Sequence, residues 1–209
     1  MTSRGRASRE RIVERAADLF AERGIAGTSV DEVLAAAGAG KGQFYHYFRG
    51  RDELAAAAIA HRCAQVLAGL TQALCDVSSL AGLEQALAGF AAGFEQMGMA
   101  GCPIGTLATE VAGRNEAARL EAAAGFDAWE RLFTDVLERM RQRGELRADA
   151  SPAVLATGLL ASIEGGMVLS QTRKDVASLR IAVEAGLGQV RARLSQDTNS
   201  EPRVGGGAR

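Results

Sequence analysis

Residues 29–54 read Ser-Val-Asp-Glu-Val-Leu-Ala-Ala-Ala-Gly-Ala-Gly-Lys-Gly-Gln-Phe-Tyr-His-Tyr-Phe-Arg-Gly-Arg-Asp-Glu-Leu, and this stretch decides the fold. Ser29 precedes an apolar run, and Glu32 follows it by three residues, which is the capping-box pattern of a helix start. Gly38 closes that short helix, and a second short helix begins at about Lys41. The stretch therefore predicts two short helices joined by a glycine-bounded turn.

The second short helix has two different faces. At about 100° per residue, Phe44 and Phe48 fall on the same side, so we expect both rings in the core. The opposite face holds Gly42, Gln43 and His46, and it is flanked by Tyr45 and Tyr47. A glycine inside a helix is unfavourable unless something approaches the backbone closely. This pattern is typical of a helix-turn-helix, whose second helix enters the major groove of DNA.

The residues before this stretch add a helix and a basic segment. Apolar residues recur at helical spacing from about Ser8 to Arg23, and Gly24 stops that helix. The first fifteen residues contain five arginines and two glutamates. Such local basic density either supplies phosphate contacts or is an ordinary solvated face. Residues 1–7 are expected to be a disordered basic arm.

Everything downstream predicts helices, so the fold class is all-α with about nine helices. The chain has 209 residues, only three prolines and 47% hydrophobic residues, which suits a helical core. The six further helices are expected at about 52–75, 80–97, 103–112, 115–143, 152–170 and 176–194. We assign residues 8–50 to a helix-turn-helix DNA-binding domain and 51–195 to a larger helical domain. Residues 196–209 are expected to be disordered.

Composition excludes several classes of protein. Cys63, Cys75 and Cys102 form neither a disulfide framework nor a metal-ligand pattern, so no metal is expected. The polar, basic N-terminus contains no signal peptide, which predicts a cytoplasmic protein. Residues 153–169 are short for a bilayer and contain Glu164, so they predict a buried interface helix and no membrane partner. No catalytic constellation or phosphate loop is present, and we expect neither an enzyme nor a cofactor.

The first 58 residues resemble a known family. Ala37-Gly38-Ala39-Gly40-Lys41-Gly42-Gln43-Phe44-Tyr45-His46-Tyr47-Phe48, followed by Arg51-Asp52-Glu53-Leu54, is similar to the DNA-binding domain of the tetracycline-repressor (TetR) family. The resemblance is specific over about residues 9–58 and only architectural beyond them. It implies a homodimer on a palindromic operator in double-stranded DNA, with the eighth and ninth helices forming the dimer interface.

The resemblance also implies roles for single residues. Ser29 caps the helix that crosses the DNA backbone, and Thr28 beside it reaches a phosphate. Lys41, Tyr45, Tyr47 and Arg51 match positions that contact phosphates. Gln43 matches a base-reading position, where its amide suits adenine. Gly42 lets the groove approach the backbone, and His46 either reads a base or is simply exposed to solvent.

Gly40 and Leu34 depart from the family pattern. Gly40 stands where serine or threonine is common, so a side-chain cap and a phosphate contact are lost. The loss at the cap costs only a few tenths of a kcal/mol. Leu34 replaces a usually small residue, which indicates different packing between the first two helices.

The family further implies a small-molecule effector bound in the C-terminal domain. The candidates for lining its cavity are His61, Phe90, Phe94, Cys102, Leu107, Phe126, Trp129, Phe133, Glu164 and Met167. The aromatic members are equally explained as ordinary core. Glu164 lies in an apolar helix and needs a partner if it is buried: a cationic ligand, an arginine or water.

Cys102 allows a second kind of signal. It precedes a proline-started helix, whose N-terminal dipole stabilises a thiolate, so it is either an oxidant or electrophile sensor or a small residue that lines a pocket. The leading hypothesis is a ligand-responsive transcriptional repressor. The alternatives are a thiol-based sensor, an activator, and an interaction protein that uses the helix-turn-helix for another purpose.

Overall fold

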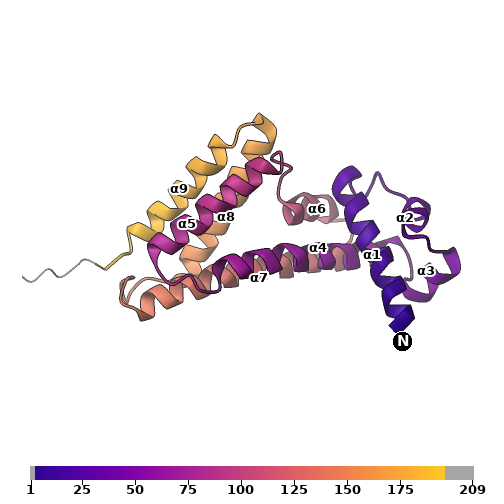
Figure 1. Cartoon of the computed structure of the whole chain (residues 1–209), viewed down its shortest axis with the longest axis horizontal. Helices are drawn as coiled ribbons and strands as arrows, with labels where there is room; N and C mark the ends of the chain where they lie inside the picture. The colour runs from indigo at the N-terminus through magenta and orange to yellow at the C-terminus, as the bar shows by residue number, and fades with distance from the viewer. Residues whose placement is uncertain (1–2, 196–209) are drawn as a thin grey trace, which may run out of the picture.

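The computed structural model describes residues 3–195, and within that range the chain is all-helical, as the sequence predicts (Figure 1). The helices are α1 (Ser3–Arg23), α2 (Val30–Ala37), α3 (Lys41–Tyr47), α4 (Arg51–Leu74), α5 (Leu80–Gln96), α6 (Pro103–Val111), α7 (Glu116–Gln142), α8 (Pro152–Arg173) and α9 (Ala177–Arg191). Their order and number match the nine helices expected for this fold class.

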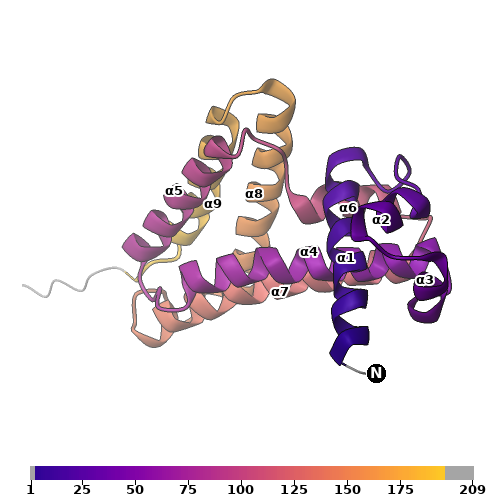
Figure 2. The same cartoon turned by 45° about the vertical axis from the view of Figure 1, so that its right-hand side comes forward.

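Helices α1, α2 and α3 form a small unit at one end of the molecule (Figures 1 and 2). Its core contains Ile12 and Phe20 of α1, Val33 of α2, and the two phenylalanines expected there. Phe44 and Phe48 are each 1% exposed, which confirms that this side of the second short helix anchors it. The Arg9 guanidinium stacks over the Phe48 ring at 5.2 Å from the ring centroid, and so joins α1 to the end of α3.

The N-terminal arm differs from the expectation. Ser3–Ala7 are helical and continue α1 backwards without a break, where the sequence predicted disorder. The reason is local: Ser8 and Ile12 are already buried against the unit, and arginine and alanine extend a nucleated helix at little cost. Residues 1–2 and 196–209, also expected to be disordered, lie outside the described residues.

The remaining helices build a larger unit around two long ones. α4 and α7 lie side by side along the length of the molecule, and α5, α8 and α9 gather at the end away from α1–α3 (Figure 2). α6 lies between these two ends and packs on α1, α4 and α7. Helices α4 and α8 are long and apolar enough to cross a membrane by length and composition alone. Both pack against other helices of the fold, and core helices pass the same test.

Gly125 sets how closely α4 and α7 approach. A Cβ atom built on it would overlap the Cys63 sulfur of α4. Both residues are buried, and the Cys63 thiol lies 3.8 Å from the Glu121 carbonyl oxygen one turn earlier on α7. The small residue is therefore required by packing between helices and not by backbone conformation.

Gly125→Ala should reveal this packing. The added methyl overpacks the crossing and should lower the free energy of unfolding by about 1–3 kcal/mol, partly offset by the better helix propensity of alanine. Gly93→Ala in α5 is the matched control, because a Cβ there meets nothing within 4 Å. The control should be stabilised by up to about 1 kcal/mol.

Urea titrations of both variants measure the difference. Cys63→Ala combined with Gly125→Ala should recover part of the loss, because removing the sulfur makes room for the methyl. Equal effects of the two glycine substitutions would contradict the packing argument.

Candidate functional site

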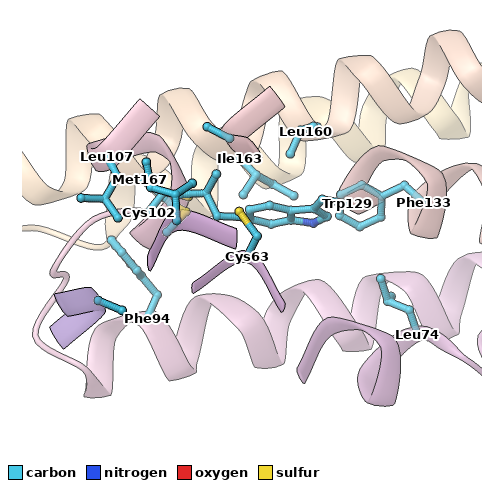
Figure 3. Packing of buried hydrophobic residues seen from close by; sticks show 14 of the residues in the cluster. Cys63, Leu74, Phe94, Cys102, Leu107, Trp129, Phe133, Leu160, Ile163 and Met167 are labelled. Atoms are coloured by element: carbon cyan, nitrogen blue, oxygen red, sulfur yellow. The ribbon is translucent and has the colours of Figure 1, made fainter. Parts of the chain in front are cut away.

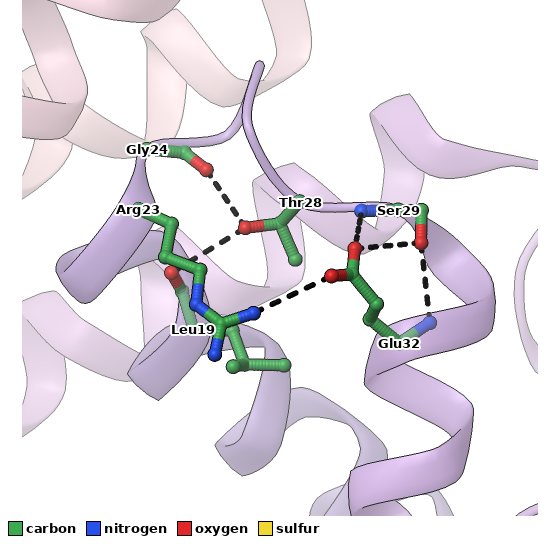
Figure 4. Close-up of polar contacts among 6 residues, drawn as sticks. All are labelled: Leu19, Arg23, Gly24, Thr28, Ser29 and Glu32. Carbon is green, nitrogen blue, oxygen red and sulfur yellow. Dashed lines mark hydrogen bonds and ion pairs between the residues drawn. The ribbon is translucent and has the colours of Figure 1, made fainter.

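The start of α2 is held by a complete capping box (Figure 4). The Glu32 backbone N–H donates to Ser29 Oγ at 3.2 Å, and the Ser29 backbone N–H donates to Glu32 Oε2 at 2.8 Å. The Ser29 hydroxyl also donates to Glu32 Oε2 at 2.7 Å, and the two bonds from Ser29 to this carboxylate, followed by the Arg23 charge, hold the pKa of Glu32 below its usual value. Both halves of the predicted box are present, so Ser29 is committed to fixing the direction of α2.

Thr28 does not face solvent. Its side chain is 1% exposed, and its hydroxyl donates to the Gly24 carbonyl at 2.9 Å and points toward the Leu19 carbonyl at 3.4 Å (Figure 4). A hydroxyl that satisfies carbonyls at the end of α1 stabilises that end, because these groups have no partner within the helix. The expected phosphate contact of Thr28 is corrected to this structural role.

The outer face of α3 is free for a partner. Gly42, Gln43 and His46 are exposed, and Tyr45 is 68% exposed. Tyr47 is half-buried and packs edge-on against Phe48, so only part of its ring faces outward. Lys41 Nζ lies 3.1 Å from an Asp31 carboxylate oxygen in an exposed ion pair. Such a pair is weak in water, so a phosphate could replace the aspartate.

Gly40 and Gln43 keep one half of a capping box at the start of α3. Gly40 has no side chain with which to cap α3, as the sequence indicates. The Gly40 backbone N–H instead donates to Gln43 Oε1 at 3.1 Å. Gln43 therefore has a structural contact in addition to its exposed position on the outer face.

The α1–α2 loop is tied to the larger unit by two side chains, and a third side chain joins two helices of that unit beside it. The Glu110 carboxylate of α6 accepts hydrogen bonds from the backbone N–H groups of Ile25, at 2.8 Å, and Ala26. Arg51, at the start of α4, donates to the Ile25 carbonyl oxygen. Asn115, which caps α7, donates through Nδ2 to the Asp52 carbonyl at 3.0 Å. The start of α4 and the end of α6 thus meet at this loop, and the start of α7 is bonded to the start of α4.

A cavity of about 720 Å³ lies in the larger unit, within the size range of small-molecule sites. Five of the ten predicted residues line it: Phe90, Phe94, Trp129, Phe133 and Met167. Figure 3 shows Trp129 and Phe133 side by side within the cluster, with Ile163 of α8 beside them. Arg62 of α4 lines the cavity as well, and it also contacts α1.

Comparison with known proteins agrees with this arrangement. Residues 12–58 match the family model described as bacterial regulatory proteins of the tetR family, and residues 79–185 match that of the transcriptional regulator LmrA/YxaF-like C-terminal domain. The uncharacterized HTH-type transcriptional regulator YxaF of Bacillus subtilis is 32% identical over 88% of this chain and 95% of its own. The chain belongs to the TetR family.

Two further relatives extend the comparison. The HTH-type transcriptional repressor DhaR of a Mycobacterium species is 28% identical over 80% of this chain and 84% of its own. A TetR-family regulator from Cytophaga hutchinsonii shares the fold, with a TM-score of 0.81 at 21% identity over 94% of this chain and 99% of its own. This TetR-family chain is therefore a DNA-binding transcription regulator and not an enzyme.

The other five candidates for the cavity of this TetR-family regulator lie outside its lining. His61 lies in a separate groove between α1, α4 and α7. Leu107 is 1% exposed and belongs to the core, and Phe126 packs against that core from outside. Cys102 is 4% exposed and lies beside Glu164. Helical periodicity predicted which side of each helix faces the interior, but not which of those residues reach the cavity.

Cys102 caps α6 with its sulfur, which accepts from the Gly105 N–H at 3.3 Å. Burial and the neighbouring Glu164 nevertheless raise the pKa of this thiol above its ordinary value. Burial likewise raises the pKa of the Glu164 carboxyl, which lies beside Cys102, and Glu164 Oε1 has no hydrogen-bond partner among the described residues. A reactive cysteine requires an accessible thiolate, so the thiol-sensor alternative loses its physical basis.

Sequence reasoning missed Arg62 and Glu110. Arg62 is the one arginine of the long apolar helix α4 beyond its first turn, and Glu110 is a lone acid near the end of the short helix α6. Isolated charges on apolar helices were the available signal for both. Glu110 bonds to backbone N–H groups, and Arg62 bonds to a backbone carbonyl as well as to the side chains of Asp18 and Gln65. No pattern of side chains in the sequence displays the backbone partners.

Thiol reactivity in the native protein should follow these environments. Cys75 is exposed and should react with N-ethylmaleimide at pH 7.5 within minutes. Cys102 should stay unmodified, and Cys63 as well, because burial and then Glu121 raise the pKa of Cys63 to about 11. Since a raised pKa lowers the thiolate fraction at neutral pH, both buried thiols should react at least about a hundredfold more slowly.

Peptide mass spectrometry after timed quenching measures all three rates in one sample. Unfolding in urea is the control and should make the three rates similar. Modification of Cys102 in the native protein as fast as that of Cys75 would restore the sensor hypothesis.

Proposed function

We propose that this protein is a homodimeric, cytoplasmic repressor that binds a palindromic operator and leaves it when a small molecule enters the cavity. One observation carries the proposal: Arg62 lines the cavity and also donates through Nη2 to the Ala17 carbonyl of α1 at 3.1 Å. The cavity and the DNA-binding unit therefore share a side chain. A relative named a transcriptional repressor supports repression over activation.

The outer face of α3 supplies the proposed contacts with DNA. Lys41, Tyr45 and Tyr47 reach phosphates, and Gln43 and His46 face the base edges, with Gly42 leaving room between them. Ser29 and Arg51 serve mainly by holding this face in place, through the capping box and the hydrogen bond to Ile25. Thr28 is left out because it is buried.

Two substitutions should distinguish contacts with phosphates from contacts with bases. Lys41→Ala should weaken binding about equally on every sequence and reduce the slope of log K against log salt by about one. Gln43→Glu should alter the preferred bases while keeping an oxygen to accept the Gly40 N–H. Because the added negative charge weakens binding generally, relative preferences are compared and not absolute affinities.

Selection from randomised DNA, followed by fluorescence anisotropy, provides these measurements. Arg143→Ala, at the far end of α7, is the control and should change neither quantity. An unchanged sequence preference in Gln43→Glu would remove Gln43 from base readout. No selection of any sequence by the native protein would contradict the proposed function itself.

The proposed dimer surface is an apolar face on α8 and α9. Val154, Val168 and Leu169 of α8 and Ile181 of α9 are between 44% and 70% exposed. Gly165 lies on the same side, and a Cβ there meets nothing within the chain. Gly166, in contrast, lies against Ala182 of α9 and serves packing within one chain. Apolar patches of this kind commonly mark protein–protein interfaces.

Charges placed on this face should separate the protomers. Val168→Glu together with Ile181→Glu should raise the dimer dissociation constant at least about a hundredfold, since buried unpaired carboxylates cost several kcal/mol. Leu120→Glu on α7, where leucine is also exposed, is the control and should leave the dimer intact. Sedimentation equilibrium measures the mass, and a dimer that survives the double substitution would place the interface elsewhere.

A further inference from the structure

The cavity is almost free of polar groups. Its lining consists mainly of leucine, phenylalanine, methionine and alanine side chains, and Arg62 is the one charged residue among the described residues that line it. Gln65 lies beside Arg62 and accepts from its Nη1 at 3.1 Å, so these two polar groups partly satisfy each other. When a ligand binds in this cavity, most of its surface leaves water and contacts apolar side chains.

Trp129 is the exception inside this apolar lining. Trp129 is 1% exposed, and its indole N–H is buried with no hydrogen-bond partner within residues 3–195. The neighbouring groups are rings: the Phe90 and Phe133 centroids lie 5.9 Å and 6.4 Å from that of the indole. Buried tryptophan N–H groups are nearly always paired, and an unpaired donor is costly. Trp129 therefore adds an unsatisfied donor to the N–H groups of Arg62, Gln65 and Gln85 in this lining, and a ligand acceptor that reaches it would satisfy it.

Arg62 determines which charge the cavity tolerates. Its guanidinium is held by the Ala17 carbonyl and lies 3.3 Å from Asp18 Oδ1, so the side chain cannot withdraw without breaking contacts to α1. Its Nε is also buried without a partner. A cationic ligand would be desolvated next to this positive charge, with no carboxylate among the described residues that line the cavity, which is unfavourable.

We propose that the cavity selects a non-cationic, largely apolar aromatic molecule whose oxygen atom, of the carbonyl or ether type, accepts a hydrogen bond from the Trp129 indole N–H. This assignment rests on the proposed function, because it names the class of effector for the same cavity. The rings of Phe90, Phe94 and Phe133 supply the surface against which an aromatic body packs.

Trp129 is the only tryptophan in the chain, so an indole nitrogen-15 label gives one NMR signal that reports on this group alone. Benzophenone and 1,1-diphenylethylene are suitable probes, because they share one shape and differ in a carbonyl oxygen against a methylene carbon. Benzophenone should bind about tenfold more tightly by calorimetry, the difference that one hydrogen bond provides. It should move the indole N–H signal downfield, and diphenylethylene should not.

Two controls test the remaining parts of the inference. Trp129→Phe keeps an aromatic ring but removes the donor, so the two probes should bind with similar affinity. Because this variant could fail to fold, its helical circular dichroism is checked, and the labelled native protein gives an independent answer. (4-Benzoylbenzyl)trimethylammonium carries the same carbonyl with a cation and should not bind.

The outcomes separate this inference from the proposed function. Equal binding of the two neutral probes, an unmoved indole signal, binding of the cation, or failure of all three compounds to bind would each overturn the inference. Release of operator DNA by the probes is measured separately by anisotropy. A probe that binds as described but leaves the protein on DNA would overturn ligand-responsive repression and leave the site assignment standing.

Discussion

The Glu110 carboxylate is the contact on which the arrangement of the two units depends. It accepts from two consecutive backbone N–H groups of the α1–α2 loop, and these groups follow α1, which Gly24 ends in a left-handed conformation. A carboxylate with two N–H donors makes charge-assisted hydrogen bonds, which are stronger than neutral ones. Because the loop also receives Arg51 from α4, the helix-turn-helix cannot rotate against α4 or α6 without breaking bonds at this loop.

Helix α4 connects the α1–α2 loop with the cavity. Its first residue, Arg51, contacts the α1–α2 loop, and Arg62, three turns later, contacts α1 and lines the cavity. Cys63 comes next and fits against Gly125, which leaves little freedom for α4 to slide along α7. Packed helices respond to such contacts by moving as units and not by gradual deformation. Only a ligand that favours one position of α4 over another would shift the DNA-binding unit.

The sequence predicted the helices and their buried sides well, but it predicted poorly which groups the polar side chains contact. The capping box at Ser29, the buried sides of Phe44 and Phe48, and the nine helices follow from local rules that the residues themselves express. Thr28 is different. From the sequence, a hydroxyl beside a helix cap is free to contact a phosphate, but in the fold this hydroxyl donates to the Gly24 carbonyl. For Cys102, the helix N-terminus was predicted correctly, but its effect on the thiol is outweighed by burial and by Glu164, which is 62 residues away in sequence. The roles of Thr28 and Cys102 therefore depend on how deeply each residue is buried and on which residues the fold places against it.

Gln43 shows how a change in one residue alters the role of another. With no hydroxyl at Gly40, the start of α3 depends on Gln43 Oε1, which accepts the Gly40 N–H. The assignment of the amide is chemically fixed, because an N–H donor must meet oxygen and not the amide nitrogen. While this bond holds, the group that Gln43 directs outward is Nε2, a donor. Bidentate pairing with adenine needs the amide oxygen to accept as well, whereas a lone donor matches purine N7, guanine O6 or thymine O4. In the proposed interface with DNA, the absence of a side chain at Gly40 would therefore also narrow the set of bases that Gln43, three residues later, reads.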